Sequence, residues 1–261
     1  MQDLEHHLTQ GRDAMETGEF AEAVTSFRKA VTLAPDSAEA HVLLGEALAE
    51  DGRLGEALGS LKRAAELAPG DLDVLYALGD LFFETGEREP ALAAYRRILE
   101  LDPGEADAWV SIGLIHFNQE KIEQAVDCYR RALQIESDSP FALNSLGDAL
   151  YAQGDNEQAL SCYRRVLAVD PEDPQAHYNL AEMHYDTGDL EAAEAECREA
   201  VRLDPGFAFA HLTLGNIYLD LERPREALHS FQEFLLHERS ADSRDIRDEV
   251  AAVVEGLKAE L

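Results

Sequence analysis

The sequence predicts an all-α repeat protein built from seven helix-turn-helix units. The first observation behind this is a proline that recurs in steps of 34 residues: Pro35, Pro69, Pro103, Pro171 and Pro205. Ser137 stands where the one missing proline would fall. A fixed period of roughly 20 to 50 residues indicates a solenoid, in which each repeat packs only on its neighbours.

Small residues at two further positions of the repeat are the second observation. With the prolines at position 32, the repeats begin at Leu4, Ala38, Leu72, Ala106, Pro140, Pro174 and Ala208. Position 8 is glycine in every repeat except the sixth, which has Ala181, and position 20 is always alanine. Since small side chains let two backbones approach closely, we expect these positions where helices pack.

Each unit contains two segments with apolar residues at helical spacing. The third unit shows both: Leu75, Leu78 and Phe82, then Ala91, Tyr95 and Ile98. Gly86 lies between them, where a short turn must join two antiparallel helices. Glu120 and Glu222 replace this glycine in the fourth and seventh units. Each unit is therefore predicted as helix, turn, helix, with the proline after the second helix.

The repeat boundaries carry their own start signals. Ser139 and Asp173 are predicted N-caps, and the prolines after them, Pro140 and Pro174, suit the first turn of a helix. After Arg239 the repeat fades, and residues 240–244 read as a capped helix start. The following residues form one predicted apolar stripe: Ile246, Val250, Val253 and Leu257. We expect this last helix to cover the face that the seventh repeat would expose.

These patterns resemble the tetratricopeptide repeat family over residues 4 to 239. Trp109 holds the first large position of the fourth repeat. A later aromatic position is held by Phe27, Tyr95, Tyr129, Tyr163 and Phe231. The resemblance implies a right-handed superhelical α-solenoid that forms a single domain. Residues 1–239 would hold seven tandem repeats, and residues 240–261 the C-terminal capping helix.

The formal net charge of −31 has two interpretations. Such a field repels nucleic acids and anionic membranes and favours cationic partners. Alternatively, 53 acidic residues beside 22 basic ones reflect adaptation to a salty cytoplasm, where screening removes the self-repulsion. The second interpretation predicts stability that rises toward molar salt. The composition leaves both open.

The chain carries no sequence signal for export or membrane insertion. No apolar run approaches the roughly 18 residues that a membrane-spanning helix needs, and the N-terminus lacks the pattern of a secretory signal. We therefore expect a cytoplasmic protein without membrane insertion. The three cysteines, Cys128, Cys162 and Cys197, are expected to be small buried residues rather than a disulfide framework.

No catalytic, cofactor-binding or metal-binding motif stands out. Phosphate-binding loops, dinucleotide fingerprints and zinc-ligand spacings are absent. His41, His177 and His211 share position 4 of their repeats, where packing residues are expected. Paired carboxylates have no diagnostic value in so acidic a chain. The sequence therefore predicts a protein that is not an enzyme and has no cofactor and no metal site.

The resemblance implies that the first helix of each repeat lines a concave groove through positions 2, 5, 9 and 12. These positions give a predicted partner-binding set of aromatic and acidic residues: Tyr76, Asp80, Phe83, Phe117, Asp148, Tyr151, Tyr178, Glu182 and Tyr185. The same positions also carry Glu39, Glu46 and Asp73. Carboxylates beside aromatic faces suit Arg or Lys. The alternative is that the aromatics belong to the ordinary repeat and the carboxylates to salt adaptation.

Some members of the family grip a C-terminal carboxylate with basic residues and asparagines on the groove. Here Asn144 and Asn179 are present, but Arg12 is the only basic residue at the corresponding positions. The sequence therefore argues against that kind of clamp. It favours a non-catalytic scaffold that holds a protein or peptide with basic and apolar residues. The alternative function is a structural protein that self-assembles into homo-oligomers, which strong like charge opposes at low salt.

Overall fold

The structure, a computed structural model, describes residues 2–240 and 242–261, and these residues form helices and turns without a strand. The helices of the first four repeats are α1 (Gln2–Glu16), α2 (Phe20–Leu33), α3 (Ala38–Glu50), α4 (Leu54–Leu67), α5 (Leu72–Glu84), α6 (Arg88–Leu101), α7 (Ala106–Phe117) and α8 (Ile122–Ile135). The rest are α9 (Pro140–Gln153), α10 (Asn156–Val169), α11 (Pro174–Asp186), α12 (Leu190–Leu203), α13 (Ala208–Asp220), α14 (Pro224–His237) and α15 (Arg244–Glu260). The predicted all-α class is confirmed.

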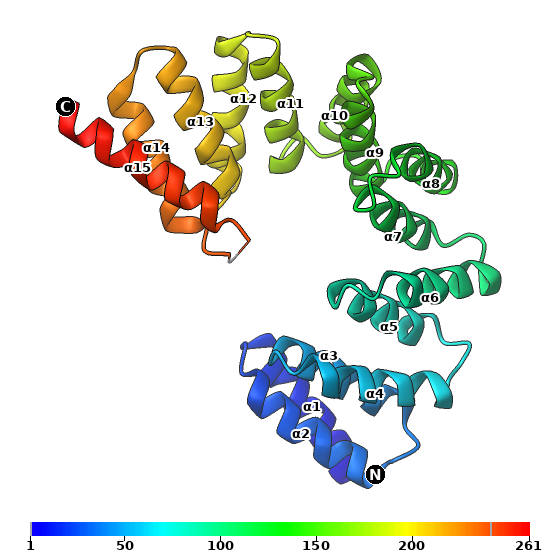
Figure 1. Cartoon of the computed structure of the whole chain (residues 1–261). Coiled ribbons are helices and arrows are strands. Elements are labelled where there is room, and N and C mark those ends of the chain that lie inside the picture. The colour runs from blue at the N-terminus through cyan, green and yellow to red at the C-terminus, as the bar shows by residue number, and fades with distance from the viewer. Residues whose placement is uncertain (1, 241) are drawn as a thin grey trace. The chain divides into compact units, whose positions relative to one another are not determined.

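Each odd-numbered helix from α1 to α13 packs on the helix that follows it, which gives seven hairpins (Figure 1). The first helices of repeats two to seven begin at the residues that the proline period predicts. No helix in the described part of the chain is both long and apolar enough to span a membrane.

The chain divides into two compact units, residues 1–135 and 136–261. The first holds α1 to α8, and the second holds α9 to α15. Within each unit the second helix of one repeat packs on the first helix of the next, as α2 does on α3 and α12 on α13. The prediction of a single solenoid domain remains a prediction.

The turn inside each hairpin uses a residue with positive φ. Five repeats have glycine there, with φ between 75° and 85°. Glu120 and Glu222 adopt φ 58° at the same place in the fourth and seventh repeats. Because left-handed backbone is unfavourable for a residue with a Cβ, these two turns are strained.

The predicted start signals at the fifth and sixth repeats are confirmed. The Ser139 hydroxyl accepts from the Ala142 amide at 3.4 Å, and an Asp173 carboxylate oxygen accepts from the Ala176 amide at 2.6 Å. Pro140 and Pro174 are the first residues of α9 and α11.

The last helix packs on the seventh repeat as expected, but with a different face. Val250, Val254 and Leu257 are buried in a cluster with Phe231 and Phe234. The predicted stripe was wrong at two positions, since Ile246 and Val253 are 40% and 39% exposed. Val250, Val254 and Leu257 stand at i, i+4 and i+7, so they share one face of α15. Val253 lies about 100° around the helix axis from Val254, so it points away from that face.

The start of this helix also differs from its prediction. Ser243 precedes α15 without a side-chain capping bond, and its backbone amide donates instead to the Ser240 hydroxyl at 3.2 Å. Residue 241 of the predicted start lies outside the described residues.

Candidate partner-binding groove

The nine predicted groove residues all lie on first helices of repeats. They divide between the two units: Tyr76, Asp80 and Phe83 on α5 and Phe117 on α7, then Asp148 and Tyr151 on α9 and Tyr178, Glu182 and Tyr185 on α11. In the first unit α3 packs beside α5, and in the second α11 packs beside both α9 and α13. The first helices α3 and α5 of the first unit, and α9, α11 and α13 of the second, therefore lie side by side.

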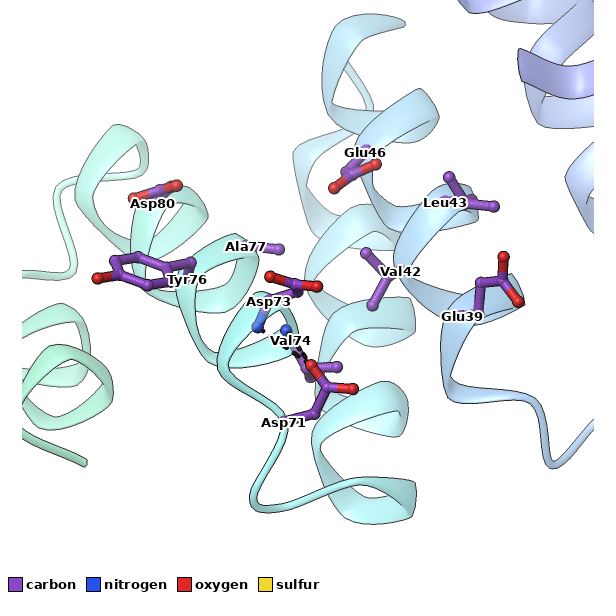
Figure 2. A pocket seen from close by; sticks show the side chains of 10 residues that line it. All are labelled: Glu39, Val42, Leu43, Glu46, Asp71, Asp73, Val74, Tyr76, Ala77 and Asp80. Atoms are coloured by element: carbon purple, nitrogen blue, oxygen red, sulfur yellow. Dashed lines mark hydrogen bonds between the residues drawn. The ribbon is translucent and has the colours of Figure 1, made fainter. Parts of the chain in front are cut away.

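A cavity of about 620 Å³ opens between α3 and α5. Its lining residues are Glu39, Val42, Leu43, Glu46, Asp71, Asp73, Val74, Tyr76, Ala77 and Asp80. Figure 2 shows Val42 and Glu46 of α3 on the side of that helix toward α5 and the turn before it. Five of the lining residues carry a carboxylate, and none of these described residues is basic. We call this hollow the acidic cavity.

Local sequence places the carboxylates of the acidic cavity. Glu39 and Glu46 stand seven residues apart on α3, so they share one face of that helix. Asp71 is the N-cap of α5 and accepts from the amides of Asp73 and Val74 at 3.1 and 3.3 Å (Figure 2). Asp73 lies in the first turn of α5, where the helix dipole favours negative charge.

The carboxylates of the acidic cavity differ in the groups that they contact. Glu39 forms an ion pair with Arg12 at 2.5 Å, and Asp80 accepts from the Tyr95 hydroxyl at 2.6 Å. Burial, with Asp73 as a second cause, raises the pKa of Glu46. Within the described part of the chain, no basic side chain pairs with Glu46 or Asp73. Glu46 and Asp73 therefore give the acidic cavity uncompensated negative charge.

The remaining predicted residues of the first unit take part in packing. Tyr76 lines the acidic cavity, and its hydroxyl donates to Glu105 at 3.1 Å. Phe83 and Phe117 are half-buried at the ends of α5 and α7, and Phe83 packs against the core cluster that contains Tyr95. Part of the Phe83 ring is therefore in contact with the hydrophobic core and is not available to a partner.

In the second unit the predicted carboxylates already accept hydrogen bonds from the protein. Asp148 Oδ1 accepts from the Tyr163 hydroxyl at 2.8 Å and from the Asn179 amide at 2.9 Å. Burial raises the pKa of Asp148, and the hydrogen bond from Tyr163 offsets only part of this rise. Glu182 accepts from the Thr213 hydroxyl at 2.7 Å.

The predicted tyrosines of the second unit bridge neighbouring repeats. The Tyr151 hydroxyl donates to Asp186, and the Tyr185 hydroxyl donates to Asp220 at 2.8 Å. Burial, and then the Asp220 contact, raises the pKa of Tyr185 to about 12. The Tyr178 ring lies 4.9 Å from that of Phe207, centroid to centroid. These side chains hold adjacent hairpins together, which sequence position alone did not indicate.

The predicted set omitted most of the acidic cavity. Glu39, Glu46 and Asp73 occupy groove positions 2 and 9, so the repeat register contained the signal for them. Asp71 lies outside the groove positions, and only its place as an N-cap marks it. The amides of Asn144 and Asn179 both donate to carboxylates of the protein, Asp173 and Asp148, so neither is free for a carboxylate ligand.

The histidines at position 4 share one hydrogen bond. Nε2 of His41, His177 and His211 lies 3.0, 3.2 and 3.0 Å from the carbonyl oxygen of the proline six residues earlier. In these three repeats the ring thereby joins the start of the first helix to the loop before it. The three cysteines are buried, and burial raises the pKa of Cys128 to about 11.

One family model matches most of the chain. Residues 2–208 match the family described as the cilia and flagella-associated protein 70 C-terminal domain, a tetratricopeptide repeat family. No curated protein matches the sequence.

Solved structures support the same fold at low sequence identity. A tetratricopeptide repeat protein from Parabacteroides merdae is 19% identical, with a TM-score of 0.79 over 98% of this chain and 100% of that one. The APC/C hetero-tetramer Cut9–Hcn1 is 18% identical, with a TM-score of 0.74 over 92% of this chain and 48% of that one. Yeast Tom70 is also 18% identical, with a TM-score of 0.74 over 92% of this chain and 50% of that one. At these identities the likeness establishes an α-solenoid of tetratricopeptide repeats and nothing about partners.

Proposed function

Since the chain belongs to the tetratricopeptide repeat family of the cilia and flagella-associated protein 70 C-terminal domain, we propose that it is a non-catalytic protein-interaction scaffold. Its occupant is a segment of a partner protein that lies along the first helices of the repeats. The hetero-tetrameric assembly of one structural neighbour, Cut9–Hcn1, agrees with a role in protein assembly.

The acidic cavity is the observation that carries this proposal. Its carboxylates surround an apolar patch of Val42, Leu43, Val74 and Ala77. Lys or Arg side chains would neutralise the carboxylates, while an apolar side chain would cover the patch. The partner segment is therefore basic and apolar. We place its first contacts at Glu46 and Asp73, because among the described residues these two carboxylates have neither a basic partner nor a hydrogen-bond donor, whereas Asp71 and Asp80 accept hydrogen bonds and Glu39 pairs with Arg12.

The predicted tyrosines and carboxylates of the second unit play a different part in this proposal. Their hydrogen bonds to residues of the neighbouring first helix, namely Asn179, Asp186, Thr213 and Asp220, hold the first helices in register, so that surface is preorganised before a partner arrives. Long-range attraction from the net charge of −31 speeds the encounter with a cationic segment, and salt weakens it.

A peptide with alternating Lys and Leu, labelled with a fluorophore, tests the proposal by anisotropy. Each exposed ion pair contributes about 0.2–1 kcal/mol, so the double variant Glu46→Gln/Asp73→Asn should weaken binding about 2- to 30-fold. The matched control is Glu89→Gln/Glu123→Gln, which removes two exposed charges from the second helices of the same unit. Equal weakening by both double variants would show a non-specific charge effect and overturn the proposed site.

Self-assembly into homo-oligomers is the alternative function, and light scattering across salt concentrations separates the two. We expect a monomer at every salt concentration. A particle mass that grows as salt screens the negative charge would favour self-assembly.

The peptide assay also tests the partner chemistry. A Glu and Leu peptide that binds as tightly as the Lys and Leu peptide would contradict the proposed partner chemistry.

A further inference from the structure

Three metal-ligating side chains meet on the seventh repeat, away from the acidic cavity. One ring nitrogen of His211, one of His237 and a carboxylate oxygen of Glu233 all lie within 4.8 Å of one another. His211 is buried, Glu233 is half-buried and His237 is exposed. The sequence predicted no metal site, because His211 is far from the other two along the chain.

The hairpin brings these residues together. Glu233 and His237 stand four residues apart on α14 and share one face. His211 lies in the first turn of α13, which packs on α14. The two imidazole rings are stacked, with an interplanar angle of 12° and centroids 5.9 Å apart. The Pro205 carbonyl, 3.0 Å from Nε2, holds the His211 ring in position.

The distances approach those of a metal site. Nε2 of His237 and Oε2 of Glu233 are 3.6 Å apart. Two ligands of a tetrahedral zinc ion at about 2.0–2.1 Å lie about 3.4 Å from each other. His237 is exposed, so its side chain has room to close the remaining gap. His229 extends the same face of α14, with Nδ1 4.0 Å from Glu233 Oε1.

We propose that His211, Glu233 and His237 bind a divalent transition-metal ion of the zinc type. Two imidazoles and one carboxylate suit zinc and its neighbours in the first transition row, whereas Mg²⁺ and Ca²⁺ prefer all-oxygen sites. The three protein ligands leave further coordination positions for water or for His229. The ion links the start of α13 to the end of α14 and so stabilises the last hairpin by mass action.

The sixth repeat offers a natural comparison. One period earlier, His177 replaces His211, Glu199 replaces Glu233 and Leu203 replaces His237. The His177 ring makes the same proline contact, and Glu199 pairs with Arg202 at 2.6 Å. That repeat therefore shares the fold and the first histidine but lacks the second one.

Zinc titration of the untagged chain, followed by calorimetry, tests this site. We expect one ion per chain and an unfolding temperature that rises with zinc concentration. His237→Ala should weaken binding by more than about 100-fold, since loss of an outer-shell partner alone costs about 10- to 100-fold. His237 is exposed, so this variant should fold normally. Cobalt in place of zinc should give visible d–d bands in the wild type only.

Two control variants keep the test specific. His177→Ala should leave zinc affinity unchanged, and so should His6→Ala/His7→Ala, which removes the N-terminal histidine pair. Unchanged zinc binding in His237→Ala, or loss of binding in His6→Ala/His7→Ala, would overturn the assignment. The absence of stoichiometric binding to the wild type would overturn it as well.

Discussion

Gly147 of α9 packs directly against the Tyr163 ring of α10. A Cβ at Gly147 would lie 2.4 Å from Tyr163 Cε1, well inside van der Waals contact. The same relation links position 8 to position 24 in five other repeats: Gly11 with Phe27, Gly45 with Leu61, Gly79 with Tyr95, Gly113 with Tyr129 and Gly215 with Phe231. The glycine that recurs at position 8 thus makes room for a large side chain of its own repeat.

Gly147→Ala should therefore destabilise the protein by about 2 kcal/mol, the usual cost of overpacking a core. Tyr163 is 2% exposed and its hydroxyl is held by Asp148, so the ring cannot move aside freely. Urea denaturation followed by circular dichroism measures the change. Gly59→Ala is the control, because a Cβ there meets no atom within 4 Å. That substitution in α4 should stabilise the protein by about 1 kcal/mol.

The sixth repeat reverses this pairing, with Ala181 at position 8 and Cys197 at position 24, both fully buried. Cys197→Tyr alone should overpack the core and destabilise the protein by about 1–3 kcal/mol. Together with Ala181→Gly, the same tyrosine should cost less than the sum of the single changes. A double-mutant cycle that shows a favourable coupling of about 1 kcal/mol or more would verify the compensation. Additive effects would contradict it.

Glu120→Gly should stabilise the first unit by about 1 kcal/mol. Glu120 adopts φ 58°, and glycine tolerates this backbone without the strain that a Cβ brings. Thermal unfolding of the variant measures the gain, and Glu222→Gly should repeat it in the second unit. Glu123→Gly, in the first turn of α8, serves as a control and should destabilise, because it removes an acidic side chain that interacts favourably with the helix dipole. A loss of stability in both turn variants would show that the glutamates make compensating contacts.

Glu46→Gln should raise the unfolding temperature at pH 7. In the folded protein the pKa of Glu46 is raised from its ordinary 4.5, mainly by burial, so the folded state binds this proton more tightly than the unfolded state does. Ionised Glu46 therefore costs stability at pH values above its folded pKa, and the cost disappears as pH falls below 4.5. The advantage of the variant should shrink over the same range. Thermal unfolding measured between pH 4 and pH 7 checks this.

Glu56→Gln supplies the opposite case. A hydrogen bond from Arg53 lowers the pKa of Glu56, so its ionised form stabilises the fold at neutral pH. The variant should lose stability at pH 7, by a small amount because the pair is exposed, and the loss should fade as the pH drops. The same pH trend for both variants would argue against burial as the cause at Glu46.

Much of the candidate site could be anticipated from the repeat register, but its bonding could not. Position 9 marked Asp80 and Asp148 as groove carboxylates. Their hydrogen bonds from Tyr95 and Tyr163 depend on how far each ring reaches across the hairpin, which position alone does not determine. Position 9 also marked Glu46 as a groove residue. That its carboxylate lacks a basic partner among the described residues was evident only from the structure of the acidic cavity.

The sequence by itself determined the repeat, its turns and the starts of the first helices in repeats two to seven. Proline, N-cap residues and turn glycines act on backbone within a few residues, so their effect can be read locally. Only the tertiary structure decided that Val254 rather than Val253 faces the seventh repeat, and that His211 meets Glu233 and His237. Those outcomes depend on how far each helix rotates about its axis and on contacts between side chains that are distant in sequence. A local sequence pattern predicts neither.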